Sequence, residues 1–178
     1  DGYVLSVNSA DQTIAITGAT SDAAFYGLVT LGQILDQADG EVRDLLIEDY
    51  ASIEFRGFIE GFYGTWSHEN RKSIMEYCGQ FKMNSYLYGP KNDPYHNGQW
   101  RDPYPDDKLA EIKELVELGR ETKVQFVWAA HPGGSIDLGS EEDLQALLDK
   151  FDQLYSIGVR QFGLFFDDAS TDFTHLDT

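Results

Sequence analysis

The first residues alternate between apolar and polar side chains in a way typical of paired strands. Residues 3–7 and 13–16 alternate, and residues 8–11 between them are rich in turn-forming side chains. This pattern predicts a β-hairpin. A helix is predicted next, because residues 21–22 can cap it and apolar side chains recur at spacings of three and four up to Leu35.

A short strand near residues 42–47 completes the first part of the predicted structure. A hairpin, a helix and a third strand are typical of a small unit of mixed composition. We therefore expect residues 1–53 to form an N-terminal α+β domain.

From residue 54 onward, short apolar runs alternate with amphipathic helical patterns. Continuous apolar runs suit strands that are buried on both faces, as in parallel sheets covered by helices. The chain from this point therefore reads as an α/β structure. Strands are predicted at residues 55–59, 85–88, 124–129 and 161–166, and helices at 67–80, 107–121 and 140–155.

The spacing of these runs favours a particular architecture. Roughly 30 to 40 residues separate successive strands, which is the size of one βα unit with its loops. We expect residues 54–178 to be the first four βα units of a (β/α)₈ TIM barrel, a fold of about 250 residues. An open, doubly wound sheet is the alternative.

Polar and aromatic residues gather in the loops that follow the predicted strands. In both architectures, functional sites lie at the carboxyl ends of parallel strands. The stretch 90–105 is too long for a simple connection, and loops of that kind are usually functional. The loops concerned are residues 60–66, 90–96, 131–134 and 167–168.

Asp167 and Asp168 directly follow the fourth apolar run. Repulsion between two adjacent carboxylates raises the pKa of at least one, which can keep it protonated near neutral pH for acid catalysis. Two plainer interpretations stay open: one aspartate caps a turn while the other is solvated, or the pair binds a metal.

Other strand-end residues are candidates for ligand binding. Residues 60–66 are glycine-rich but lack the ending of a phosphate-binding loop, whereas Tyr63 and Trp66 offer flat faces for a sugar. Lys91 can donate hydrogen bonds to sugar hydroxyls. The plainer alternatives are a tight turn with structural aromatics and a solvated lysine. His131 is interpreted first as a structural residue.

Charge and cysteine content exclude several classes of function. The net charge is −18, with 31 acidic and 13 basic residues, which disfavours nucleic acids and anionic membranes as partners. Cys78 is the single cysteine, so neither an intrachain disulfide nor a thiolate-rich zinc site can form. No apolar run approaches about 18 residues, so no membrane span is expected.

Several motifs, in the same order along the chain, resemble glycoside hydrolase family 84, which contains O-GlcNAcases and enzymes named hyaluronidases. Residues 56–68 resemble the family's first barrel strand, and 82–96 its second strand and loop. Residues 127–133 and 158–168 resemble its third and fourth strands. About the first 50 residues are similar, more weakly, to the α+β domain that precedes the family's barrel.

The resemblance implies a retaining β-N-acetylglucosaminidase that uses the substrate's own acetamide as nucleophile. Asp167 would orient the acetamide, and Asp168 would serve as general acid and base. The Gly61 carbonyl, Tyr63 and Lys91 would line the GlcNAc pocket. The partner would be a β-GlcNAc-containing glycan or glycoprotein. No metal or organic cofactor is implied.

Two rival functions remain for comparison. One is a metal-dependent polysaccharide hydrolase or deacetylase with Asp167, Asp168 and His131 as ligands. The other is a non-catalytic carbohydrate-binding fragment. Among glycans, the net charge of −18 favours neutral terminal β-GlcNAc over anionic hyaluronan.

The sequence departs from the family in its first loop and in its extent. Thr65 is directly followed by Trp66, where the family often has an intervening proline. With four predicted strands, we expect these 178 residues alone to be inactive and to self-associate through open barrel edges at 55–59 and 161–166. We expect a secreted or cell-surface bacterial location. The signal peptide is not within this chain, because residues 1–7 lack its features.

Overall fold

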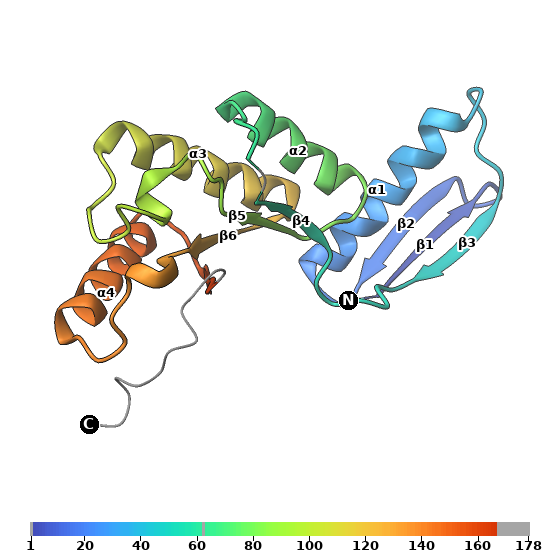
Figure 1. Cartoon of the computed structure of the whole chain (residues 1–178). Coiled ribbons are helices and arrows are strands. Elements are labelled where there is room, and N and C mark those ends of the chain that lie inside the picture. The colour runs from blue at the N-terminus through green and yellow to red at the C-terminus, as the bar shows by residue number, and fades with distance from the viewer. Residues whose placement is uncertain (1, 62, 167–178) are drawn as a thin grey trace. The chain divides into compact units, whose positions relative to one another are not determined.

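The computed structural model describes residues 2–61 and 63–166 (Figure 1). The chain divides into two compact units. The N-terminal unit comprises Asp1–Arg56 with Gly79–Met83, and the parallel-sheet unit comprises Gly57–Cys78 with Asn84–Thr178.

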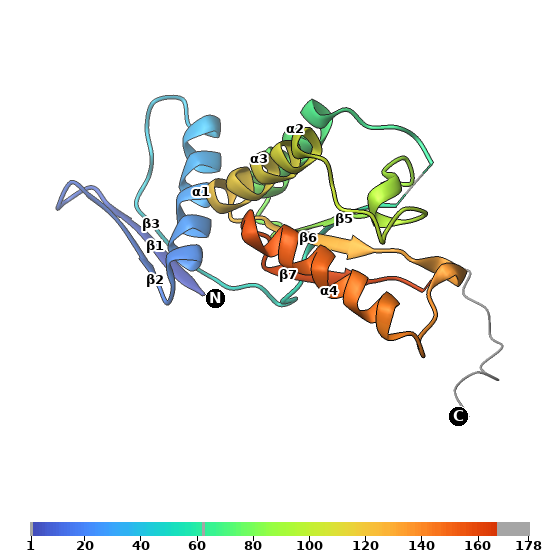
Figure 2. The same cartoon turned by 90° about the vertical axis from the view of Figure 1, so that its left-hand side faces the viewer.

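The N-terminal unit is a three-stranded antiparallel sheet with one helix. Its strands are β1 (Tyr3–Asn8), β2 (Thr13–Gly18) and β3 (Leu45–Asp49), in the order β2-β1-β3. Helix α1 (Ser21–Gln37) packs along one face of this sheet (Figure 2). The predicted hairpin and helix are therefore confirmed.

Two details of this unit differ from the prediction. The N-cap of α1 is Thr20, whose Oγ1 accepts a hydrogen bond from the Ala23 N–H at 3.1 Å. The predicted cap at residues 21–22 is wrong, because three consecutive residues could all cap and the first of them does. The third strand begins at Leu45 rather than at residue 42.

The parallel-sheet unit contains four strands in the order β4-β5-β6-β7. The helices connect successive strands, which run parallel throughout. The α/β prediction is confirmed, and the predicted ends of these elements are right within two residues. The elements are β4 (Gly57–Glu60), α2 (His68–Gln80), β5 (Ser85–Tyr88), α3 (Asp106–Thr122), β6 (Gln125–Ala130), α4 (Glu141–Ser156) and β7 (Gln161–Leu164).

Serine caps start two of these helices where the sequence predicted them. Ser67 Oγ accepts from the Asn70 N–H at 3.2 Å before α2, and Ser140 Oγ accepts from the Asp143 N–H at 3.2 Å before α4. Each cap satisfies one of the helix N–H groups that lack a partner within the helix. The loops that follow β4 and β6 therefore have defined ends.

The first strand of the parallel sheet begins with a glycine because its neighbour leaves no room for a side chain. A Cβ atom at Gly57 would lie 2.0 Å from the carbonyl oxygen of Ser85 on β5. The next residue of β4, Phe58, stacks its ring on those of Trp66 and Tyr86, with 5.3 Å and 6.2 Å between ring centroids.

The strand order bears on the two architectures that the sequence allowed. In the described strands, each new strand is added on the same side, without the reversal that defines a doubly wound sheet. Within that part of the chain, β4 and β7 each pair along one edge only, and their residues Ile59 and Leu164 are exposed. The half-barrel and self-association through its edges stay predictions.

Candidate active site

The four parallel strands end at the same edge of the sheet. Across it, Glu60 is in register with Tyr88, Tyr88 with Trp128, and Trp128 with Phe162. The loops after β4, β5 and β6 therefore start side by side. Carboxyl ends of parallel strands are where such folds place their sites.

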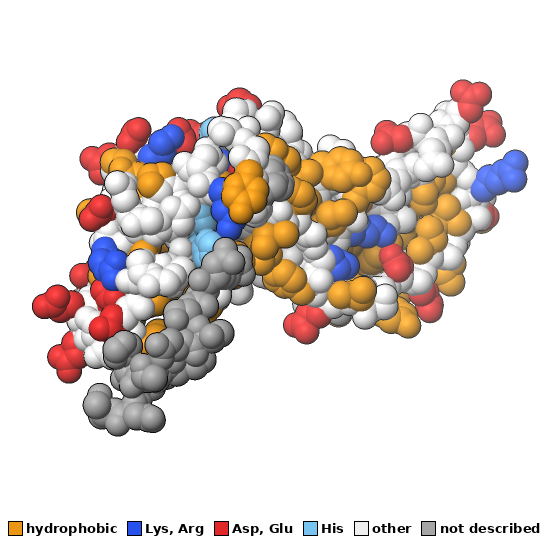
Figure 3. All heavy atoms as spheres, in the orientation of Figure 1, with side chains coloured by type: hydrophobic (Ala, Val, Ile, Leu, Met, Phe, Trp, Pro, Cys, Tyr) orange, Lys and Arg blue, Asp and Glu red, His pale blue; other side chains and the backbone are white. Residues whose placement is uncertain are grey.

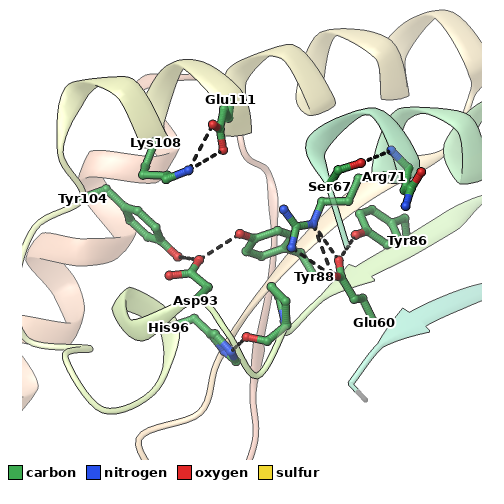
Figure 4. Close-up of polar contacts among 12 residues, drawn as sticks. Glu60, Ser67, Arg71, Tyr86, Tyr88, Asp93, His96, Tyr104, Lys108 and Glu111 are labelled. Atoms are coloured by element: carbon green, nitrogen blue, oxygen red, sulfur yellow. Dashed lines mark hydrogen bonds and ion pairs between the residues drawn. The ribbon is translucent and has the colours of Figure 1, made fainter. Parts of the chain in front are cut away.

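Glu60, the last residue of β4, is fully buried and ion-paired. Its carboxylate accepts from Arg71 Nε at 2.9 Å and from Arg71 Nη2 at 3.0 Å, and the Tyr86 hydroxyl donates to it as well (Figure 4). Burial disfavours the charged guanidinium, but the bonds to Glu60 outweigh it and hold the pKa of Arg71 above its usual range. Burial, reinforced by the Glu60 charge, raises the pKa of Tyr86, so its phenol remains a donor.

This ion pair fixes both ends of the loop that carries Gly61 and Tyr63. Glu60 precedes the loop, and Arg71 lies on α2, whose start is capped by Ser67. The loop is therefore held between a strand and a helix that are joined by a buried pair. Within this loop, Gly61 is exposed and Tyr63 is 89% exposed, so other described residues cover little of either one.

A second buried network surrounds Asp93 in the loop after β5. The Asp93 carboxylate accepts from the hydroxyls of Tyr88 at 2.8 Å and Tyr104 at 2.6 Å, and from the Tyr95 N–H at 2.8 Å (Figure 4). Trp128 Nε1 on β6 in turn donates to the Tyr104 oxygen at 3.0 Å. Burial, together with the Asp93 charge, raises the pKa of both tyrosines well above its usual range.

His96 ties the same loop to the end of β6. Its Nδ1 lies 3.0 Å from the Ala129 carbonyl oxygen and its Nε2 lies 2.7 Å from that of Pro90. A neutral imidazole can donate to one of these carbonyls at a time, whereas the protonated ring can donate to both. Burial lowers the pKa of His96, and the charge of Asp93 and the two carbonyls oppose that shift.

Lys150 holds the loop from the side of α4. The side chain is 2% exposed, and its Nζ donates to the Tyr95 carbonyl at 2.9 Å and lies 4.4 Å from the centre of the Tyr104 ring. Burial lowers the pKa of Lys150 to about 8. The loop after β5 is therefore anchored by β5, β6 and α4 together, which is unusual for a surface connection.

The predicted candidates Lys91 and His131 are brought together by this arrangement. Lys91 Nζ lies 3.5 Å from His131 Nδ1, and both side chains are half-buried. Asp167 and Asp168 lie outside the described residues, and their predicted roles therefore stay predictions. So do the predicted contacts of Gly61 and Tyr63 with a sugar.

The buried residues that anchor the loops were harder to predict from the sequence than the candidate site residues. Lys150 had a signal, because it interrupts the apolar stripe of α4 between Leu147 and Leu154 at helical spacing. Glu60 and Asp93 stand in the loops that the sequence singled out, but no role was predicted for their carboxylates. Nothing in the sequence identifies Arg71 as the partner of Glu60.

The described residues bear on two of the classes considered above, metal-dependent enzymes and membrane-spanning proteins. Within residues 2–61 and 63–166, no three or more His, Cys, Asp or Glu side chains are grouped as metal ligands. The rival metal site includes Asp167 and Asp168, which lie outside the described residues. The helices in the described part of the chain are each too short or too polar to cross a membrane.

Several proteins of known identity are similar to this chain. The protein O-GlcNAcases of Rattus norvegicus and Mus musculus are each 35% identical over 113 residues, which is 63% of this chain and 12% of the relative. The structure of CpGH84D is 50% identical with a TM-score of 0.86, and covers 95% of this chain. A variant of the Thermobaculum terrenum O-GlcNAc hydrolase is 39% identical with a TM-score of 0.64, and covers 66% of this chain.

The chain spans only part of these proteins: 12% of the curated relatives, 29% of CpGH84D and 26% of the Thermobaculum terrenum structure. Residues 1–50 match domain 2 of glycosyl hydrolase family 20. Residues 56–178 match the family described as beta-N-acetylglucosaminidase. The predicted resemblance is thereby confirmed, and the chain belongs to the beta-N-acetylglucosaminidases of glycoside hydrolase family 84.

Proposed function

We propose that the protein containing this chain hydrolyses terminal β-linked N-acetylglucosamine with retention of configuration. The observation that carries the proposal is the family match over residues 56–178. The geometry supports it, because the loops with Gly61, Lys91 and His131 start at one edge of the parallel sheet.

The proposed mechanism uses the substrate's acetamide as its nucleophile. The acetamide oxygen attacks the anomeric carbon while the bond to the leaving oxygen breaks, which forms a bicyclic oxazoline. Asp168 gives its proton to the leaving oxygen. It then takes a proton from the water that opens the oxazoline. Asp167 accepts the acetamide N–H and stabilises the positive charge of the intermediate. Two inversions give net retention.

Support for this assignment comes from the position of the two aspartates in the sequence. They are the third and fourth residues after Leu164, the last residue of β7. β7 runs parallel to β6, so its carboxyl end lies at the edge where Lys91 is found. We propose that β4 to β7 are the first four strands of a (β/α)₈ barrel around this site.

Substrate binding is assigned to the half-buried Lys91 and to the loop after β4. The Lys91 ammonium has N–H donors only, which suits the lone pairs of sugar hydroxyls. The Gly61 carbonyl can accept from a hydroxyl, and the exposed Tyr63 offers a ring face. With a net charge of −18, a neutral glycan or glycoprotein is the proposed substrate rather than hyaluronan. The secreted or cell-surface location remains a prediction.

Leaving-group dependence tests the roles of the two aspartates. Asp168→Asn should slow hydrolysis of substrates with poor leaving groups far more than that of activated aryl glycosides, because only the former need a proton for bond cleavage. Asp167→Asn should slow both classes. Equal losses for both classes in the Asp168 variant would refute the assignment.

Two further measurements separate this mechanism from its rivals. Fluorination of the N-acyl group should slow the reaction steeply, because it weakens the acetamide nucleophile. Trapping of a covalent glycosyl-aspartate in a mass spectrum would contradict substrate assistance. Loss of activity in EDTA, restored by added metal, would favour the metal-dependent hydrolase instead.

A further inference from the structure

The side chains of Lys91 and His131 meet although they belong to different loops. Lys91 follows β5 and His131 follows β6, and their Nζ and Nδ1 atoms are 3.5 Å apart. Figure 3 shows histidine and basic side chains next to one another at the surface of this unit. Lys91 and His131 are both half-buried, so part of the pair is open to a ligand at the carboxyl edge of the sheet.

The chemistry of the contact fixes which atom donates. An ammonium group has only N–H donors, so His131 Nδ1 must be the acceptor. In a neutral imidazole, Nδ1 can accept this bond only when the ring proton is on Nε2. Lysine carries its charge on a flexible four-carbon stem, and a fixed acceptor limits the positions that the charge can take.

His131 is itself held by the buried structure beneath it. Its backbone N–H donates to the His96 carbonyl at 2.6 Å, and its ring lies 6.3 Å from that of His96 with 26° between the planes. His96 is 1% exposed, and its two ring nitrogens lie 2.7 Å from the Pro90 carbonyl oxygen and 3.0 Å from that of Ala129. The acceptor offered to Lys91 is therefore part of a rigid arrangement.

We propose that His131 is a positioning residue of the sugar site, which holds the Lys91 ammonium in place through Nδ1. This inference rests on the proposed function, in which Lys91 binds a hydroxyl of the N-acetylglucosamine ring. His131 thereby takes part in substrate binding, whereas the plainer interpretation from the sequence made it a purely structural residue.

Steady-state kinetics on an aryl β-GlcNAc substrate, in the whole protein that contains this chain, test the role. His131→Ala should raise KM about tenfold with little change in kcat, because contacts present in both the ground and transition states affect KM. His131→Asn should recover most of the loss, because its side-chain oxygen can replace Nδ1 as acceptor.

A double-mutant cycle shows whether His131 acts through Lys91. Lys91→Met should raise KM at least as much as His131→Ala, and adding His131→Ala to it should have no further effect. Multiplicative losses in the double variant, or an Asn variant as impaired as the Ala variant, would overturn the proposal.

A spectroscopic measurement separates this inference from the proposed function. The ¹⁵N shifts of the His131 ring should report the Nε2–H tautomer in the wild type, and Lys91→Met should shift the Nδ1 signal. Both results can be obtained without substrate. If the wild type fails to hydrolyse aryl β-GlcNAc, the proposed function falls. If the Nδ1 signal is unmoved by Lys91→Met, the positioning role falls.

Discussion

Two ion pairs, one in each unit of the chain, differ sharply in burial. In the N-terminal unit, Lys82 pairs with Asp49 at 2.9 Å, and the two side chains are 26% and 43% exposed. In the parallel-sheet unit, Arg71 pairs with Glu60 at the same distance, but these side chains are 8% and 0% exposed. The first pair is partly exposed to solvent, and the second is buried.

The difference in burial shows that charged groups are buried beside the candidate site and not in the centre of the N-terminal unit. The N-terminal unit has an apolar centre around Tyr3, Leu5 and Tyr26, and its ion pair lies at the margin. The parallel-sheet unit buries the carboxylates of Glu60, at the end of β4, and of Asp93, in the loop after β5. Taking charges out of water is costly unless every partner is in place. The buried networks therefore give those loops a defined shape.

The largest expected effect comes from removing one charge of the buried pair. Glu60→Gln keeps the shape of the side chain but leaves Arg71 as an uncompensated buried cation, which should cost about 3 to 5 kcal/mol in the free energy of unfolding. The matched change Asp49→Asn in the N-terminal unit should cost under about 1 kcal/mol, because its pair is partly exposed to solvent. Denaturant titrations compare the two. Similar losses would remove the contrast between the units.

The next effect is a pH dependence that arises from Lys150. Its pKa is lowered by burial from 10.5 to about 8, so the unfolded chain keeps this proton to higher pH than the folded chain. The contribution of Lys150 to stability therefore rises with pH between these two values, by about 3 kcal/mol at most. Lys150→Met should lack this rise. Parallel stability curves for the wild type and the variant between pH 8 and 10 would contradict the prediction.

The smallest expected effect on stability comes from the partly exposed pair of Lys82 and Asp49. Hydrogen bonds from Lys82 and Tyr3 lower the pKa of Asp49 below its ordinary value of 3.8. The stability that this carboxylate contributes is therefore present above that value and is lost as the pH falls through the lowered pKa. Acid titration of the wild type against Asp49→Asn should show a small difference that disappears in acid. A difference that persists in strong acid, where the carboxyl group is protonated, would show that the charge of Asp49 is not its source.

The sequence predicted the elements well because their signals are local. The apolar runs of the parallel sheet and the serine caps Ser67 and Ser140 depend on neighbouring residues only. The cap of α1 was missed by one residue because Thr20 and the two residues after it are all good caps.

Part of the candidate site could be proposed from the sequence, because the order of strands and loops is also a local signal. Lys91 and His131 could be proposed because strand ends meet at one edge of a parallel sheet. The buried pairs could not be proposed, because they depend on how helices pack against the sheet: Arg71 lies on α2 and Lys150 on α4. The contact between Lys150 and Tyr95 spans 55 residues of sequence, and only the packing of α4 brings it about.

The binding of a bicyclic thiazoline that mimics the oxazoline intermediate tests the central claim most directly, because it should bind only where the site lies. Calorimetry on the whole protein would compare the wild type with Lys91→Met and with Lys82→Met, a lysine of the N-terminal unit. The account predicts at least tenfold weaker binding for Lys91→Met and unchanged binding for Lys82→Met. Equal affinities for the wild type and Lys91→Met would contradict a sugar site at the carboxyl edge of the parallel sheet.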